Sequence, residues 1–153
     1  HASRESLIDE GRWKSARSYR KNESIVDSVL QRLLRYDRFN KRVRDIEIFS
    51  CCGVGAINFR HPTTFGHEGS MNNFLRNQYI ATNYGDNCFL GGDTDEGALN
   101  LHHLIAQQCG LYRLPLDNIH HDVIDTARDR DWFFSRRGGD KTGSNTILVI
   151  RRA

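Results

Sequence analysis

A change of hydrophobic period near residue 45 constrains this fold more than any other feature of the sequence. Apolar residues recur at helical spacing across 24–44, where they include Val26, Leu30 and Leu33. From Ile46 onward, apolar and polar residues alternate, which is typical of a strand. A long amphipathic helix followed directly by a strand excludes an all-helical bundle. The sequence therefore predicts a chain that mixes helices with a sheet.

A second helix is predicted over residues 94–109. The acidic residues at 95 and 96 favour its start, and Gly110 is well placed to cap its end. We predict an α+β fold: a single domain whose mixed sheet packs against two main helices, 24–44 and 94–109. The remaining predicted elements are strands at 46–50, 54–59, 88–90 and 147–150 and a short helix at 70–80.

The length of 153 residues predicts one domain. We divide the chain into a basic N-terminal arm, 1–21, and a single α+β domain, 22–153. The longest apolar run, 147–150, is far too short to span a membrane, and no signal segment opens the chain. The chain is therefore expected to be soluble, without a membrane partner and in a compartment that remains unknown. No cofactor is predicted.

Arginine-rich segments suggest a binding role. The net charge is +3, and most of the basic residues are arginine, which binds phosphate and carboxylate in a bidentate manner. Such a face is compatible with nucleic acid or an acidic protein, so a non-enzymatic binding module is one alternative function. The arginines on the first predicted helix that would serve it are Arg32, Arg35, Arg38 and Arg42.

The stretch 45–67 carries the leading candidate site. It reads as a strand, a Cys51-Cys52-Gly53 turn, a second strand and a loop that ends in His67. A cysteine at a tight turn exposes its sulfur, and a nearby histidine lowers the thiol pKa and makes it a nucleophile. Backbone amides of the turn could form an oxyanion hole. Cys52 is the predicted nucleophile and His67 the base, with Cys51 as the weaker choice.

These residues, FSCCGVGAINFRHPTTFGH, resemble the cysteine-histidine glutamine deamidases, the group of the chemoreceptor deamidase and the cytotoxic necrotizing factor toxins. In that group a strand ends in a Gly-Cys turn, and a second strand or loop brings in the catalytic histidine. This chain has Ser50-Cys51 where a glycine would precede the cysteine. The resemblance covers residues 46–69. It implies a cysteine-dependent amidohydrolase, a small effector or toxin acting on protein or peptide amides.

Other patterns support alternative enzymes. The sequence Leu101-His102-His103 before Asn118 resembles the colicin-type HNH nucleases, which implies a metal ligand at His102, a general base at His103 and an orienting Asn118. That family places the motif on a β-hairpin, whereas this chain predicts a helix there. The Asp-Asn sequence before Cys88 is similar to that of papain-like proteases. A weak metal alternative combines His102 with His121 and Asp125, since histidine and carboxylate suit zinc.

Overall fold

The computed structural model describes residues 4–8, 24–35, 43–51, 53–66, 69–129, 131–132 and 139. Its helices are α1 (Arg4–Leu7), α3 (Ile25–Arg35), α4 (Ser70–Tyr84) and α5 (Leu101–Gly110), and its strands are β1 (Ile48–Ser50) and β2 (Ile119–His121). Short 3-10 helices are η2 (Val43–Asp45), η3 (Asp86–Cys88), η4 (Leu90–Gly92) and η5 (Leu116–Asn118).

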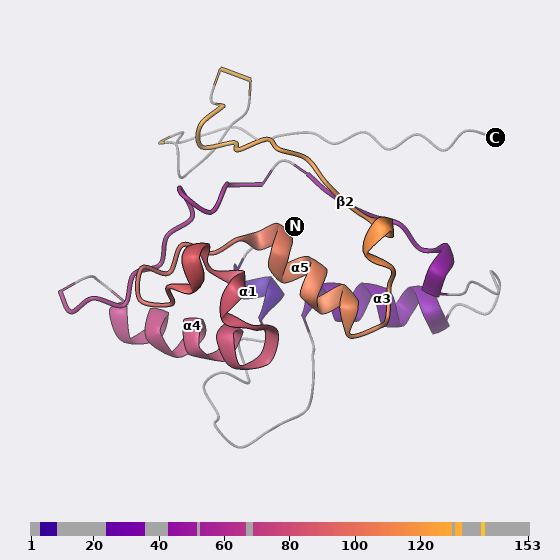
Figure 1. Cartoon of the computed structure of the whole chain (residues 1–153), viewed down its shortest axis with the longest axis horizontal. Helices are drawn as coiled ribbons and strands as arrows, with labels where there is room; N and C mark the ends of the chain where they lie inside the picture. The colour runs from indigo at the N-terminus through magenta and orange to yellow at the C-terminus, as the bar shows by residue number, and fades with distance from the viewer. Residues whose placement is uncertain are drawn as a thin grey trace.

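The two strands pair in parallel, with Ile48 opposite Ile119 and Ser50 opposite His121. Parallel strands need a long crossover connection, and here the chain passes through α4 and α5 between them. Figure 1 shows the β1–β2 ribbon running above α5, with α4 on the other side of that helix. The α+β class with one small domain is confirmed. Among the described residues the sheet is a two-stranded parallel one.

The hydrophobic core lies among α1, α3, α4 and α5. Leu30 of α3, Ile80 of α4 and Leu104 of α5 are each at most 1% exposed. The predicted arm over 1–21 needs a correction at its start, because Leu7 and Ile8 are fully buried in the same core. Their burial removes apolar surface from water, which outweighs any tendency of this segment to stay solvated. Residues 9–21 of the predicted arm lie outside the described residues.

Both main helices are shorter than predicted. The first begins as expected, with the Asp27 N–H donating to the Ser24 hydroxyl at 3.1 Å, but α3 ends at Arg35. Residues 43–45 form the tight turn η2, and 36–42 are not described. The second helix begins at Leu101 instead of 94, because the Asp93 carboxylate accepts from the N–H groups of 95 and 96 and closes a turn there. The Asn100 side chain caps α5 by accepting from the His103 N–H.

Several smaller elements also differ from prediction. Residues 56–58 form a turn where a strand was predicted over 54–59. The predicted strand 88–90 is a single bridge from Phe89 to Leu99. Gly110 belongs to α5, and the left-handed residue after the helix is Arg113, with φ 59°. The predicted short helix is confirmed and extends over Ser70–Tyr84. The predicted strand 147–150 lies outside the described residues.

Candidate active site

The candidate site lies at the carboxyl end of the parallel ribbon. Side chains alternate between the two faces of a strand, so the paired residues Ser50 and His121 share one face. That face is turned toward the first turn of α5, where His102 lies. Carboxyl ends of parallel strands and N-termini of helices both gather functional groups in α/β structures. In Figure 1 the ribbon passes directly above this end of α5.

Ser50 and His102 form the central contact. The Ser50 Oγ and the His102 Nδ1 are 2.6 Å apart, a short hydrogen bond between half-buried side chains. On the other side of the imidazole, a Cβ placed on Gly53 would lie 3.2 Å from Nε2. The end of β1 therefore lies at Nδ1 of the ring, and the turn that follows β1 lies at Nε2. A side chain at position 53 would press on the ring and change its orientation.

His121 and Asp122 complete the surroundings of His102. The rings of His102 and His121 stack with centroids 5.5 Å apart and an interplanar angle of 27°. Burial lowers the pKa of His102, the charge of protonated His121 lowers it further, and the Asp122 carboxylate opposes both effects. His102 is therefore neutral near pH 7, which leaves one ring nitrogen able to accept a proton.

The segment after β2 holds the turn after β1 in place. The Asp122 N–H donates to the Ser50 carbonyl at 3.2 Å, and the Thr126 N–H donates to the Gly53 carbonyl at 3.0 Å. Asp125 accepts from the Asn58 amide at 2.7 Å. Partial burial acts to raise the pKa of Asp125, but hydrogen bonds from backbone and Asn58 donors outweigh it and lower the pKa. Asp125 is thus ionised and committed to this loop.

The leading predicted pair is not part of the described structure. Cys52 and His67 both lie outside the described residues, so their pairing stays a prediction. Their described neighbours Cys51 and Gly53 flank the site, and Cys51 is a free, half-buried thiol.

The weaker candidates have other surroundings. Cys88 is fully buried, and burial raises its pKa to about 11, which suppresses the thiolate. His103 contacts Gln107 on its own helix through Nε2 at 3.1 Å. Asn118 donates to the carbonyls of Arg44 and Ile46 at 2.8 and 2.9 Å, so its amide fastens the start of β1.

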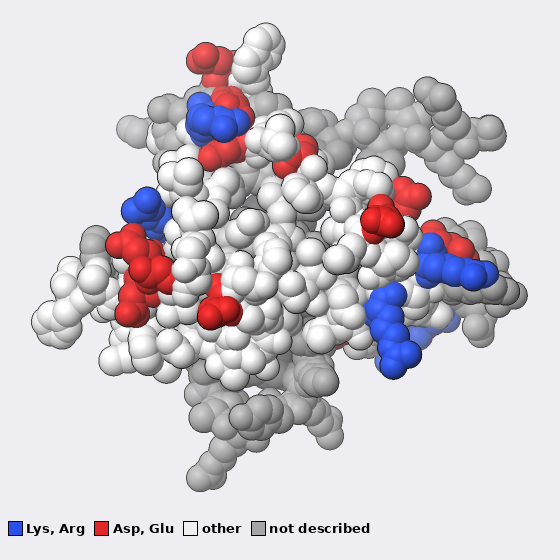
Figure 2. Space-filling view, in the orientation of Figure 1, with Lys and Arg blue, Asp and Glu red and all other residues white. Residues whose placement is uncertain are grey.

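The structure describes only some of the predicted binding residues, and it places the predicted metal residues on different elements. Arg32 and Arg35 are exposed in the last turn of α3, whereas Arg38 and Arg42 are not described. On the face seen in Figure 2, blue and red side chains of the described residues lie interspersed. Among the described residues, no group of three histidine, cysteine or acidic side chains is arranged to hold a metal ion. His102 and His121 do meet, but through their ring faces.

The sequence pattern predicted His102 as part of a nuclease motif, and it predicted no role for the Ser50 hydroxyl. The two residues are 52 positions apart, and only the crossover through α4 and α5 brings them together. A local signal did exist, because Ser50 and His121 both end strands. The parallel pairing that makes those ends adjacent cannot be read from either strand alone.

The comparisons with known proteins gave no match. No family model matches the chain, and neither a curated protein nor a solved structure is significantly similar to it. Within the described residues, none of the helices is both long enough and apolar enough to cross a bilayer.

Proposed function

We propose that this protein is a hydrolase that cleaves a carbonyl substrate, an amide or ester, with Ser50 as nucleophile and His102 as general base. The observation that carries the proposal is the 2.6 Å contact between the Ser50 Oγ and the His102 Nδ1. A nucleophile and a base within hydrogen-bond reach of each other are the signature of nucleophilic catalysis. The amidohydrolase class inferred from the sequence is kept, while the pair of residues that would perform it changes.

The protonation state of His102 supports its assignment as the base. A histidine that is neutral at pH 7 accepts the hydroxyl proton as the serine attacks, and the lowered pKa of His102 ensures that state. Proton uptake then creates an imidazolium, which the nearby Asp122 carboxylate stabilises through its charge. His121 stacks on the ring and restricts its orientation.

The proposed reaction has two steps. The Ser50 oxygen bonds to the substrate carbonyl carbon while its proton moves to His102 Nδ1. The bond from carbon to the leaving amine or alcohol then breaks, and the leaving group takes that proton. Water, deprotonated by His102, next attacks the acyl-serine ester, releases the acid and returns the proton to Ser50. The N-terminal end of α5, whose first turn carries His102, supplies positive potential for the oxyanion.

The sequence-based alternative uses the same turn with a different nucleophile. Cys52, with His67 as its base, would cleave amides through a thioester. Both versions predict a small effector-type enzyme that acts on protein or peptide amides, and they differ in which side chain a reactive probe modifies. This difference allows a test that needs no knowledge of the substrate.

The test measures the rate at which a fluorophosphonate modifies the full-length protein at pH 7.5, with the modified residue identified by peptide mass spectrometry. We expect Ser50 to be modified, and we expect His102→Gln to slow the reaction at least 100-fold, a typical contribution of a general base. His103→Gln, one residue away on α5, is the matched control and should react within twofold of the unchanged protein.

Two results would reject Ser50 and His102. One is a Ser50 modification rate that His102→Gln does not change. The other is an inert Ser50 together with fast iodoacetamide modification of Cys52 that His67→Gln slows, which would establish the cysteine alternative instead. Circular dichroism of each variant checks that the fold is retained.

A further inference from the structure

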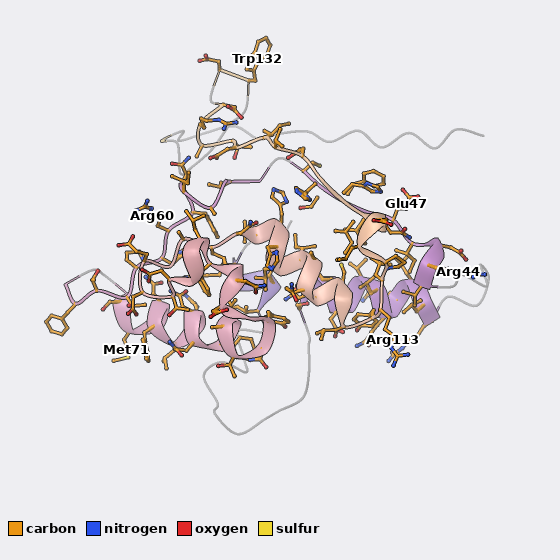
Figure 3. All side chains as sticks on the ribbon, in the orientation of Figure 1. Arg44, Glu47, Arg60, Met71, Arg113 and Trp132 are labelled. Atoms are coloured by element: carbon orange, nitrogen blue, oxygen red, sulfur yellow. The ribbon has the colours of Figure 1, made fainter. Side chains whose placement is uncertain are left out.

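The face of the ribbon that points away from α5 carries a second, separate group of side chains. We call it the outer face and define it by Glu47, Phe49 and His120. The Phe49 ring stacks on the His120 ring with centroids 4.6 Å apart and an interplanar angle of 20°. Figure 3 shows Glu47 on the side of the ribbon that points away from α5. Because side chains alternate along a strand, this group is on the opposite face from Ser50.

Phe49 is exposed yet held in a fixed position. Its side chain is 70% exposed, and its parallel contact with His120 restricts the orientation of the ring. An exposed aromatic ring that already has a fixed orientation loses little entropy when a ligand stacks on it. Most of the Phe49 side chain is not packed in the hydrophobic core, so the exposed face of its ring is available to a partner.

A carboxylate lies next to the His120 ring of this stacked pair. The Glu47 Oε2 is 3.3 Å from the His120 Nε2, and the Glu47 side chain is 58% exposed. Glu47 and Phe49 are two positions apart on the same side of the chain, which places their Cα atoms roughly 7 Å apart. A cation between them would pair with the carboxylate and lie over the ring, the combination that favours a guanidinium.

Two further carboxylates lie near the starts of the two strands. Asp45 and Asp117 precede the two strands, and the Asn118 hydrogen bonds to Arg44 and Ile46 hold these strand starts together. Arg44 is itself close to Asp45, at 3.9 Å.

We propose that the outer face is a recognition site for an arginine side chain of a partner protein. The guanidinium stacks on Phe49 and pairs with Glu47, while the peptide backbone follows the ribbon. Arginine is preferred over lysine because a planar guanidinium stacks on a ring and binds a carboxylate with two N–H groups, whereas an ammonium does neither. The site shares no residue with the Ser50–His102 site.

The experiment is an NMR titration of the full chain with the peptide acetyl-Gly-Arg-Gly-Arg-Gly-amide. Two matched peptides replace both arginines, one with lysine and one with citrulline, which has nearly the shape of arginine and no charge. We expect the arginine peptide to shift the resonances of Phe49 and His120, and to bind about fivefold more tightly than the lysine peptide. The citrulline peptide should not bind measurably.

Substitutions locate the effect. Phe49→Leu and Glu47→Gln should each weaken binding of the arginine peptide about fivefold. Phe65→Leu, at a fully exposed phenylalanine elsewhere on the surface, should leave it unchanged. The proposal is overturned if the arginine peptide causes no shift, if lysine binds as well as arginine, or if both the Phe49 and Glu47 variants bind like the unchanged protein. Glu47→Gln preserves the test if the Phe49 variant does not fold.

Discussion

Gly97 supports the loop that leads into the site helix, and replacing it with alanine gives the sharpest test of this structure. Its φ of +61° is left-handed, and a Cβ there would lie 2.2 Å from the His61 carbonyl oxygen and 2.7 Å from the Asn77 Nδ2. Gly91 is a matched control, since its φ is +67° and a Cβ there would meet nothing within 4 Å. Both substitutions incur the same backbone cost, and only one creates a clash.

The magnitudes follow from these contacts. Alanine in a left-handed conformation costs about 1 kcal/mol, which is the whole effect expected at Gly91. At Gly97 the neighbouring backbone must also move by about 1 Å, because real Cβ contacts are rarely below 3.0 Å. That movement disrupts the His61 N–H bond to the Gly97 carbonyl and the Asn77 bond to the His61 carbonyl, each contributing about 1 kcal/mol. With overpacking of about 1 kcal/mol or more, Gly97→Ala should cost about 4 kcal/mol.

Urea unfolding followed by circular dichroism measures the difference between the two variants. With a slope of about 2 kcal/mol per molar urea for a chain of this size, the midpoint of Gly97→Ala should lie about 1.5 M below that of Gly91→Ala. A Gly97 variant that is unfolded without urea, beside a folded Gly91 variant, agrees with the same reasoning. Midpoints within about 0.3 M of each other would show that the loop does not approach His61 as described.

The remaining predictions concern the pH dependence of stability, the reactivity of three thiols and the Asn118 amide. The pKa of His102 is lower in the folded state, so the unfolded chain binds more protons just below pH 6.5. The free energy of unfolding should therefore fall as the pH drops through that range. Urea titrations at several pH values should show that His102→Gln reduces this dependence of the unfolding free energy on pH. Iodoacetamide at pH 8 should modify Cys51 well before Cys88 and Cys109, whose pKa values burial raises to about 11, as peptide mass spectrometry would show. Asn118→Ala should cost about 2 kcal/mol in urea unfolding, since two backbone carbonyls lose their donor.

Sequence patterns predicted the local elements well where one signal acted alone. The periodicity of α3 and α4 located the starts of these helices and the alternation of β1 located its end, because burial of one face decides each of them, whereas the end of α3 at Arg35 was not predicted. The start of α5 was misplaced because the acidic residues at 93, 95 and 96 are equally suited to a helix start and to a turn that the Asp93 side chain closes. Gly97 distinguishes the two, because its left-handed backbone, with φ +61°, does not fit a helix that begins at 94.

The two faces of the ribbon show why the sites themselves could not be predicted. The alternation of Glu47, Phe49 and Ser50 along β1 is visible in the sequence, but which face meets α5 depends on a pairing with β2 across about 70 residues. A shift of one residue in that register would exchange the faces and turn Phe49 toward His102 and Ser50 toward solvent. The hydroxyl–imidazole contact and the exposed aromatic stack therefore share one cause, and the Ser50–His121 pairing determines both. If Phe49 were found buried and Ser50 exposed, both proposals would fail together.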